Sequence, residues 1–210
     1  ISNLNQKDIT YAEELGYKIK LLGIAKSQNA DVEIRVHPTL VPKNRLVANV
    51  DGAMNAVLVH GNMVGPTLYY GAGAGAEPTA SAVVADVIDI ARQTKLSQNT
   101  LIPSLGFMPD KINEKNILSI ENIFSEYYLR FTMKNQAGLL AKITNIFADH
   151  DISINSMVHK EVQENNQNPD IFLITSKTKE ADIDIIISEI ELLPENTEKV
   201  VKIRTEELNK

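Results

Sequence analysis

Hydrophobic residues within residues 8–26 recur at every third or fourth position, which predicts an amphipathic helix. The positions on the apolar side are Ile9, Ala12, Leu15, Ile19 and Leu22. Asn5 stands where a helix N-cap is expected, and Asp8 follows three residues later, as in a capping box. On such a helix Glu14 and Lys18 would form an exposed ion pair one turn apart.

Alternating apolar and polar residues predict three strands in the same half of the chain. Residues 32–36 alternate in this way, and Pro38 and Pro42 are expected to close the strand. Residues 53–60 and 63–70 predict two further strands, joined by a Gly-Asn dipeptide that favours a hairpin turn.

A second helix is predicted over residues 80–92. Pro78 precedes it, and proline suits the first helical turn because its missing N–H would have no partner there. We expect this helix to bury one stripe, formed by Val83, Val87 and Ile90. Residues 94–123 then lose all periodicity and contain prolines and a polar run, which predicts a surface connector between domains.

The pattern after residue 123 predicts the order βαββαβ. Strands are expected over 127–133, 152–158, 171–175 and 200–204, helices over 139–150 and 180–192, and a polar hairpin loop over 163–169. The second helix is rich in β-branched isoleucine and could form a strand; we assign a helix because its polar residues lie opposite Ile183, Ile186 and Ile190. This order is ferredoxin-like, with two helices on one face of a four-stranded sheet. The other face would be free for a partner chain, so we expect self-association.

Composition narrows the classes of function. The net charge of −6 and the scattered Lys and Arg residues argue against nucleic acid and a basic membrane patch. No apolar run approaches the ~20 residues that a membrane helix needs. The absence of cysteine rules out disulfides and fits a reducing cytoplasm. The chain begins at Ile1 without a leader, which we interpret as the interior of a longer protein.

Three alternating glycines precede the predicted helix at residues 80–92, in the segment Gly71-Ala72-Gly73-Ala74-Gly75. Such residues let backbone approach a bulky ligand, and a helix N-terminus favours a negative group. The spacing is not that of the dinucleotide fingerprint. Tight packing and ligand contact therefore both remain open.

Other candidates for chemistry are weak. The four histidines, His37, His60, His150 and His159, are scattered and lack metal-ligand spacing, so we expect no metal site. Asp8 and Lys20 are expected on the surface rather than in acid–base roles.

Several segments of the first half resemble, in order, landmarks of the bacterial homoserine dehydrogenase family. They are residues 15–25 (Leu-Gly-Tyr-Lys-Ile-Lys-Leu-Leu-Gly-Ile-Ala), Val36 to Pro42, Asn55-Ala56-Val57, and Gly71 to Asp86. The resemblance implies NAD(P)-dependent interconversion of L-aspartate 4-semialdehyde and L-homoserine, on the route to threonine, isoleucine and methionine. It further implies that Gly73 and Gly75 contact the cofactor, with Gly75 against the nicotinamide. The family's cofactor domain and catalytic acid–base residues would lie before Ile1, so no catalytic residue is expected here and the fragment should be inactive alone.

The second half is similar to ACT domains, effector-sensing modules of amino-acid biosynthesis. The similarity rests on residues 128–131 (Tyr-Leu-Arg-Phe), 137–143 (Ala-Gly-Leu-Leu-Ala-Lys-Ile) and 151–154 (Asp-Ile-Ser-Ile). It implies an effector site at Asn135, Gly138 and Leu139, where free helix N–H groups could hold a carboxylate. The family pattern Asp-x-Pro-Gly is here Asn-Gln-Ala-Gly, so the acid and the proline are lost. Threonine is the expected effector, and a domain that only dimerises is the alternative.

The chain is therefore expected to be α+β: the C-terminal portion of an α/β catalytic domain over residues 1–93, a connector over 94–123, and a ferredoxin-like βαββαβ ACT domain over 124–210. NAD or NADP would be bound mainly by the preceding domain. The expected protein is a cytoplasmic homo-oligomer that associates through the ACT domain. A non-catalytic ligand-binding or dimerisation protein is the alternative, as is a fragment that pairs with a separate cofactor-binding chain.

Overall fold

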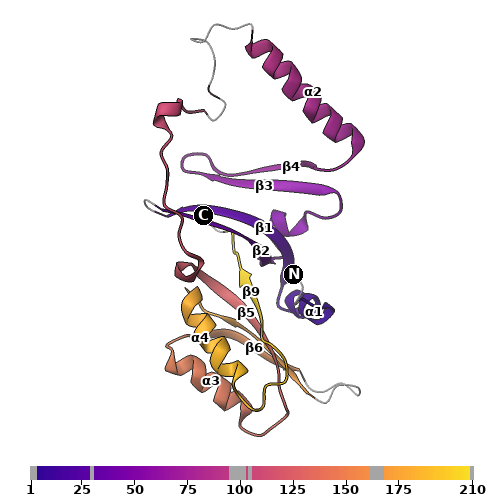
Figure 1. Cartoon of the computed structure of the whole chain (residues 1–210). Helices are drawn as coiled ribbons and strands as arrows, with labels where there is room; N and C mark the ends of the chain where they lie inside the picture. The colour runs from indigo at the N-terminus through magenta and orange to yellow at the C-terminus, as the bar shows by residue number, and fades with distance from the viewer. Residues whose placement is uncertain (1–3, 29–30, 95–102, 104–105, 161–167, 209–210) are drawn as a thin grey trace. The chain divides into compact units, whose positions relative to one another are not determined.

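The computed structural model describes residues 4–28, 31–94, 103, 106–160 and 168–208 (Figure 1). The chain forms two compact units. Ile1–Ala48 and Asn116–Asn209 make the larger one, called here the sheet unit. Asn49–Lys115 make up nearly all of the smaller one, the hairpin unit. Each unit is described separately.

The core of the sheet unit is the predicted βαββαβ fold. Its elements are β5 (Phe124–Thr132), α3 (Leu139–Asp149), β6 (Ile154–Lys160), β7 (Asp170–Thr175), α4 (Glu180–Glu191) and β9 (Val201–Thr205). The strands lie in the order β9-β5-β7-β6 and all these pairs are antiparallel. A short strand β8 (Thr178–Lys179) also pairs with β5. The ferredoxin-like prediction is confirmed, and so is the helical assignment of the isoleucine-rich segment. The predicted polar loop at 163–169 lies mostly outside the described residues.

Two further strands extend this sheet beyond β9. The strands β1 (Tyr17–Gln28) and β2 (Asp31–Pro42) form an antiparallel hairpin. β2 then pairs with β9 in parallel, Thr39 opposite Arg204 and Leu40 opposite Thr205. The sheet order is therefore β1-β2-β9-β5-β7-β6. The ladder continues past Pro38, so the expectation that this proline closes the strand is wrong.

The helix predicted over residues 8–26 is correct only in its first part. The helix α1 (Gln6–Glu14) begins with the expected capping box between Asn5 and Asp8. It stops before Gly16, whose φ of +86° is left-handed backbone that a helix cannot continue through. The following residues form β1, where pairing with β2 outweighs the local helical spacing. Glu14 consequently pairs with Lys160 at 2.7 Å rather than with a helical Lys18.

Two apolar clusters lie on opposite faces of the sheet. The helices α3 and α4 cover one face around Leu129, Phe131 and Ile186. The other face was expected to be free of helices, and this expectation is wrong. α1 covers it, because Ala12 packs with Tyr128 and Phe172 of the sheet, and Tyr11 stacks on Phe172 with ring centroids 4.3 Å apart. The chain thus occupies with its own helix a surface predicted to receive a partner.

The hairpin unit contains β3 (Met54–Gly61), β4 (Gly65–Ala72) and α2 (Ala76–Gln93). β3 and β4 are antiparallel, which confirms the predicted hairpin. Its turn is longer than expected and ends at Gly65, which has a φ of +75°.

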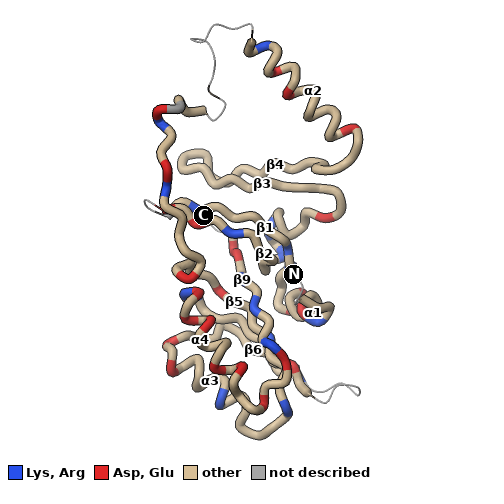
Figure 2. The backbone as a smooth tube through the Cα atoms, viewed as in Figure 1, with Lys and Arg blue, Asp and Glu red and all other residues tan. Residues whose placement is uncertain are grey.

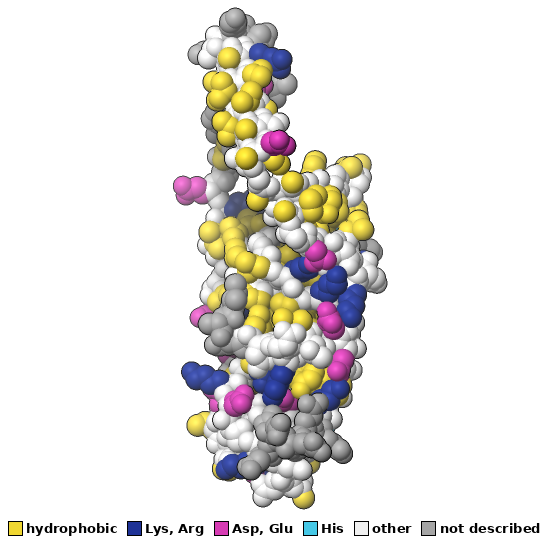
Figure 3. Space-filling view, turned by 90° about the vertical axis from the view of Figure 1, so that its right-hand side faces the viewer, with side chains coloured by type: hydrophobic (Ala, Val, Ile, Leu, Met, Phe, Trp, Pro, Cys, Tyr) yellow, Lys and Arg dark blue, Asp and Glu magenta, His cyan; other side chains and the backbone are white. Residues whose placement is uncertain are grey.

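The apolar stripe predicted on α2 is not buried. Val83, Val87 and Ile90 are 56%, 59% and 61% exposed, and no side chain within residues 76–93 is buried. Figure 3 shows apolar side chains gathered over this helix. An amphipathic helix buries its stripe only by packing against another apolar surface. Val57, Val59 and Tyr69 of the hairpin are themselves exposed, so in the described part of the unit the two apolar surfaces are not packed together.

The connector predicted over residues 94–123 is partly outside the described residues. The described part contains the short 3-10 turns η3 (Pro109–Lys111) and η4 (Ile120–Asn122). Its end joins the sheet unit, since Ile117 bridges to Val32 and Ile123 is buried.

Candidate functional site

The turn between β5 and α3 brings together the three residues expected to bind an effector. Asn135 and Gly138 are exposed, and Gly138 is the N-cap of α3 with a φ of +83° and no side-chain hydrogen bond. Leu139 is different, because its side chain is only 5% exposed and its N–H donates to the carbonyl of Gln136 at 3.2 Å. Leu139 therefore anchors the turn in the core, while the open positions are Asn135 and Gly138.

An acidic side chain from a distant part of the chain lies against the same turn. Glu195 is 5% exposed, and its carbonyl accepts from the N–H of Lys134 at 2.9 Å. Its carboxylate pairs with Lys142, one turn into α3. The hydrogen bond from Lys142 is the main cause that lowers the pKa of Glu195. A negative charge thus stands near a turn that has lost the acid of the family pattern, and no sequence signal pointed to it.

A buried ion pair joins α1 to the centre of the sheet. Arg130 Nε donates to Asp8 Oδ1 at 2.6 Å, and the two residues are 2% and 0% exposed. The hydroxyl of Tyr128 also donates to Asp8, at 3.2 Å. Asp8 was expected on the surface, and that expectation is wrong because Arg130 compensates its charge in the interior.

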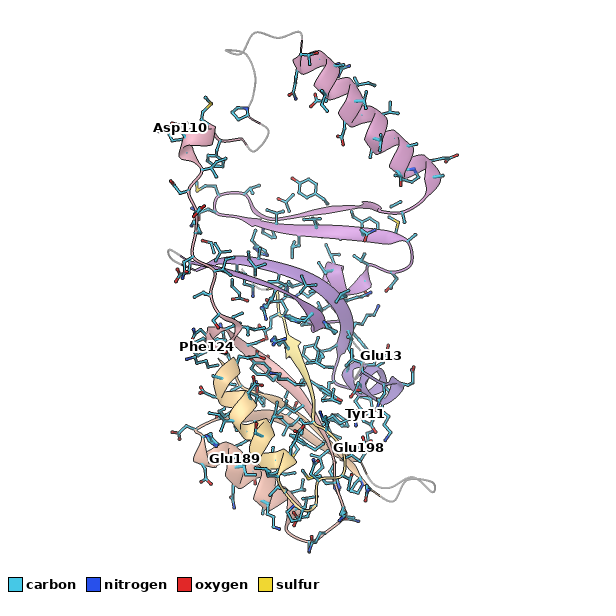
Figure 4. The ribbon with its side chains drawn as sticks, viewed as in Figure 1. Tyr11, Glu13, Asp110, Phe124, Glu189 and Glu198 are labelled. Atoms are coloured by element: carbon cyan, nitrogen blue, oxygen red, sulfur yellow. The ribbon has the colours of Figure 1, made fainter. Side chains whose placement is uncertain are left out.

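The same network continues to the start of β7. Asp170 accepts from Lys7 Nζ at 2.9 Å, from the Thr132 hydroxyl at 2.8 Å and from the Tyr11 hydroxyl at 3.2 Å. Burial alone would raise the pKa of Asp170, but the hydrogen bonds from Lys7 and Thr132 outweigh it and hold the pKa below its usual value. Burial and the neighbouring Asp170 raise the pKa of Tyr11 to about 12. Figure 4 labels two members of this network, Tyr11 of α1 and Glu198, which lies 3.2 Å from the Thr132 hydroxyl.

A second buried cluster lies on the face covered by α4. Glu180 accepts from Arg204 Nε at 2.7 Å and from the Tyr127 hydroxyl at 2.7 Å, and it pairs with Lys202. Burial would raise the pKa of Glu180, but the hydrogen bonds from Arg204, Lys202 and Tyr127 lower it overall. Lys202 also pairs with Asp184, so two acidic and two basic side chains balance one another. The cluster is therefore a structural joint between α4, β5 and β9.

In the glycine segment, Gly73 and Gly75 are glycine for different local reasons. A Cβ added to Gly73 would lie 1.8 Å from Asn55 Nδ2, so the side chain of Asn55 occupies that space. Gly75 is the N-cap of α2 with a φ of +127°, a conformation that other residues rarely adopt. Gly71 faces open space, with nothing within 4 Å of an added Cβ. All three glycines are exposed. Packing against Asn55 accounts for Gly73 and the backbone conformation accounts for Gly75, whereas Gly71, near the end of β4, has neither constraint.

The histidines with described contacts have separate local partners. His37 is buried and its Nδ1 lies 3.0 Å from the Thr39 hydroxyl, while His150 Nε2 lies 2.9 Å from Glu189 at the ends of α3 and α4. Among the described residues no group of three or more metal-ligating side chains is placed to hold an ion. None of the helices described is long and apolar enough to cross a membrane. In Figure 2, acidic and basic residues are interspersed along the described backbone.

Comparison with known proteins assigns both parts of the chain. The family model described as homoserine dehydrogenase matches residues 1–88, and the ACT domain model matches residues 127–195. Curated homoserine dehydrogenases from Pseudomonas aeruginosa and Neisseria gonorrhoeae are 46% and 47% identical to this chain over its whole length. The chain belongs to the homoserine dehydrogenase family. It spans about half the length of these relatives, 48% of each.

Solved structures of the same family have the same fold. The crystal structure of a homoserine dehydrogenase from Thiobacillus denitrificans matches 100% of this chain and 47% of its own, with a TM-score of 0.89 and 51% identity. A Staphylococcus aureus homoserine dehydrogenase matches 100% of this chain with a TM-score of 0.65 and 28% identity. The α+β fold of a homoserine dehydrogenase C-terminal half with an ACT domain is therefore confirmed.

Proposed function

We propose that this chain is the C-terminal half of an NAD(P)-dependent homoserine dehydrogenase, which interconverts L-aspartate 4-semialdehyde and L-homoserine. The identity of 46–47% across the entire chain supports this proposal. We divide the chain functionally into residues 1–93 of the catalytic domain, a connector at 94–123 and a regulatory ACT domain at 124–210. In this proposal the protein works in the cytoplasm, as an oligomer formed through the ACT domain.

The start of α2 fits a role in holding the cofactor. Gly75 leaves the first N–H groups of α2 without a side-chain cap, and such groups favour a negatively charged ligand. The exposed backbone at Gly71 and Gly75 leaves room for a flat ring, whereas Gly73 acts through its contact with Asn55. A bound nicotinamide supplies or accepts the hydride, and this chain would contribute only to its placement.

The test compares two proteins. The 210-residue chain alone is expected to show no NAD(P)-dependent oxidation of L-homoserine, because the acid–base groups of the reaction are proposed to lie outside it. The longer product of the same gene is expected to be active. Turnover by the isolated chain would contradict the proposal that the acid–base groups lie outside it. An inactive longer protein would favour a non-catalytic binding or dimerisation role.

We further propose that an amino acid binds at the turn between β5 and α3, with threonine as the first candidate. The exposed Asn135 and Gly138 would receive its carboxylate and polar groups, and the ion pair of Glu195 with Lys142 lies beside the turn. Calorimetric titration of L-threonine into the chain tests this directly. An Asn135→Leu variant is expected to weaken binding at least about tenfold, the effect of losing one well-placed polar partner. Equal binding by both proteins, or no heat with either, would contradict it.

A further inference from the structure

The segment that covers the free face of the ACT sheet belongs to the other family match. α1 lies in residues 1–88, which match homoserine dehydrogenase, and Arg130 lies in residues 127–195, which match the ACT domain. Three contacts besides the Asp8–Arg130 pair hold α1 on the sheet: the Tyr11–Phe172 stack, and the ion pairs of Lys7 with Asp170 and Glu14 with Lys160. The two matched regions are thus physically joined at this face.

The contact between α1 and the sheet combines apolar packing with a buried ion pair, although apolar side chains alone could have filled the same space. An apolar pair of similar volume is often as stabilising as a buried ion pair, because removing two charges from water is costly. The Asp8–Arg130 pair instead demands one position, since the guanidinium also reaches Thr132 from Nη1 at 3.2 Å. Such a contact fixes where α1 sits on β5 more strictly than it stabilises the fold.

A series of hydrogen bonds connects Arg130 with the candidate effector site, the turn between β5 and α3. The Thr132 carbonyl accepts from the N–H of Thr197 at 3.0 Å, and two residues later the N–H of Lys134 donates to Glu195. Glu195 in turn pairs with Lys142 of α3. The strand end, the turn and the first turns of α3 are therefore tied to the residue that holds α1.

The Thr132 hydroxyl has two acceptors within hydrogen-bond distance, and they lie on different parts of the sheet unit. Its hydroxyl lies 2.8 Å from Asp170 and 3.2 Å from Glu198, but one hydroxyl carries only one proton to donate. Asp170 is bound to α1 through Lys7 and Tyr11, whereas Glu198 is a half-exposed residue of the loop before β9. The choice of acceptor therefore ties Thr132 either to the side of α1 or to the loop beside Glu195. Donation to one acceptor or the other would supply the two alternative states through which two sites can be coupled.

We propose that α1, Arg130 and Thr132 form the link through which the β5–α3 turn and the dehydrogenase-family segment influence each other's conformation. Arg130 acts as a positioning residue in this link. The direct coupling of turn and helix stands on the contacts above, and its regulatory meaning rests on the proposed effector site.

Hydrogen exchange of the 210-residue chain tests the link. The variant Asp8→Asn keeps the shape of the side chain but removes its charge. Among amides that exchange by local opening, which does not follow the overall stability, it is expected to speed exchange at least about tenfold both in α1 and in residues 134–141, with smaller changes in β7 and α4. The matched control is Glu13→Gln on the exposed side of α1 (Figure 4), expected to change exchange in the turn less than about twofold. Faster exchange confined to α1, or raised equally in every element, overturns the proposal.

A second variant serves if Asp8→Asn does not fold. Thr132→Val removes only the hydroxyl and leaves the Asp8–Arg130 pair in place. Exchange in residues 134–141 is expected to rise, and unchanged exchange there would refute the link. Adding L-threonine separates the two proposals: wild type is expected to gain protection in the turn and in α1, and Thr132→Val in the turn alone. No response to threonine in either protein would reject threonine as the effector, while the exchange of the variants without ligand still decides the link.

Discussion

Asp8 and Arg130 lie 122 positions apart in the sequence, yet their side chains meet at 2.6 Å inside the sheet unit. One begins the segment that matches homoserine dehydrogenases and the other stands in the middle of the first ACT strand. Because both side chains are almost completely buried, neither charge can be exchanged for water without moving α1. The ion pair therefore fixes the position of α1 relative to the ACT sheet.

Replacing Asp8 with alanine is expected to destabilise the sheet unit by about 3–5 kcal/mol, because Arg130 would keep a buried charge without its partner. Urea unfolding followed by circular dichroism measures the change. Glu13→Ala, an exposed acid of the same helix, serves as the control and should shift the unfolding free energy by less than about 0.5 kcal/mol. The double variant Asp8→Ala with Arg130→Met should recover part of the loss, and a further loss on adding Arg130→Met would contradict this account.

The elements predicted best from sequence are those whose neighbours in the chain also form their core. α4 was predicted correctly from the polar residues opposite Ile183, Ile186 and Ile190, and these three isoleucines are indeed fully buried against the sheet. The capping box at Asn5 was likewise predictable, since both partners lie within one turn. Local periodicity carries this information because it decides which face an element buries.

The segment after Glu14 shows where local patterns fail. Ile19 and Leu22 fit a helical stripe, but Tyr17 pairs with Pro42 and the rest of β1 follows in register. Only that pairing, together with the left-handed Gly16, converts the segment into a strand. The turn residues of the site were predicted, but their distant partners were not: Arg130, the partner of Asp8, and Glu195, the partner of the turn, come from distant parts of the chain, and no spacing relates them.

The contact between Gly73 and Asn55 predicts the result of a paired substitution. Gly73→Ala places a methyl group in the space that the Asn55 amide occupies, so it should destabilise the hairpin unit by about 1–3 kcal/mol. Asn55→Ala opens that space. The double variant should therefore be more stable than Gly73→Ala alone, as measured by amide exchange of β3 and β4. Strictly additive losses would show that the two residues do not share this contact.

Glu180 is expected to make the free energy of unfolding depend on pH in the acid range. Its pKa is lower in the folded chain than in the unfolded one, where it is about 4.3. The unfolded state then binds the proton first, so the stability from Glu180 is complete above that value and disappears as the pH falls through the folded pKa. Unfolding free energies measured between pH 5 and pH 2 should fall less steeply in Glu180→Gln than in wild type. The control Glu189→Gln, at an exposed site of α4, should keep the wild-type slope; an unchanged slope in Glu180→Gln would contradict the prediction.

His37 is expected to make the stability of the folded chain depend on pH in a higher range than Glu180 does. Its protonated form carries a positive charge, whereas the ionised Glu180 carries a negative one. Burial is the main cause that lowers its pKa. The hydrogen bond with the Pro38 carbonyl opposes this in part, and the charges of Arg204 and Arg35 each add a smaller decrease. The folded chain therefore holds His37 neutral, while the unfolded chain protonates it near pH 6.5. Stability is complete above that value and declines below it, because protons then bind preferentially to the unfolded state. Urea unfolding at pH 7.5 and pH 5.5 should show a smaller loss on acidification in His37→Gln than in wild type. The comparison with His150→Gln, a partly exposed histidine at the end of α3, separates burial from the mere presence of an imidazole. If both variants lose as much stability as wild type, the buried ring is not what links folding to pH in this range.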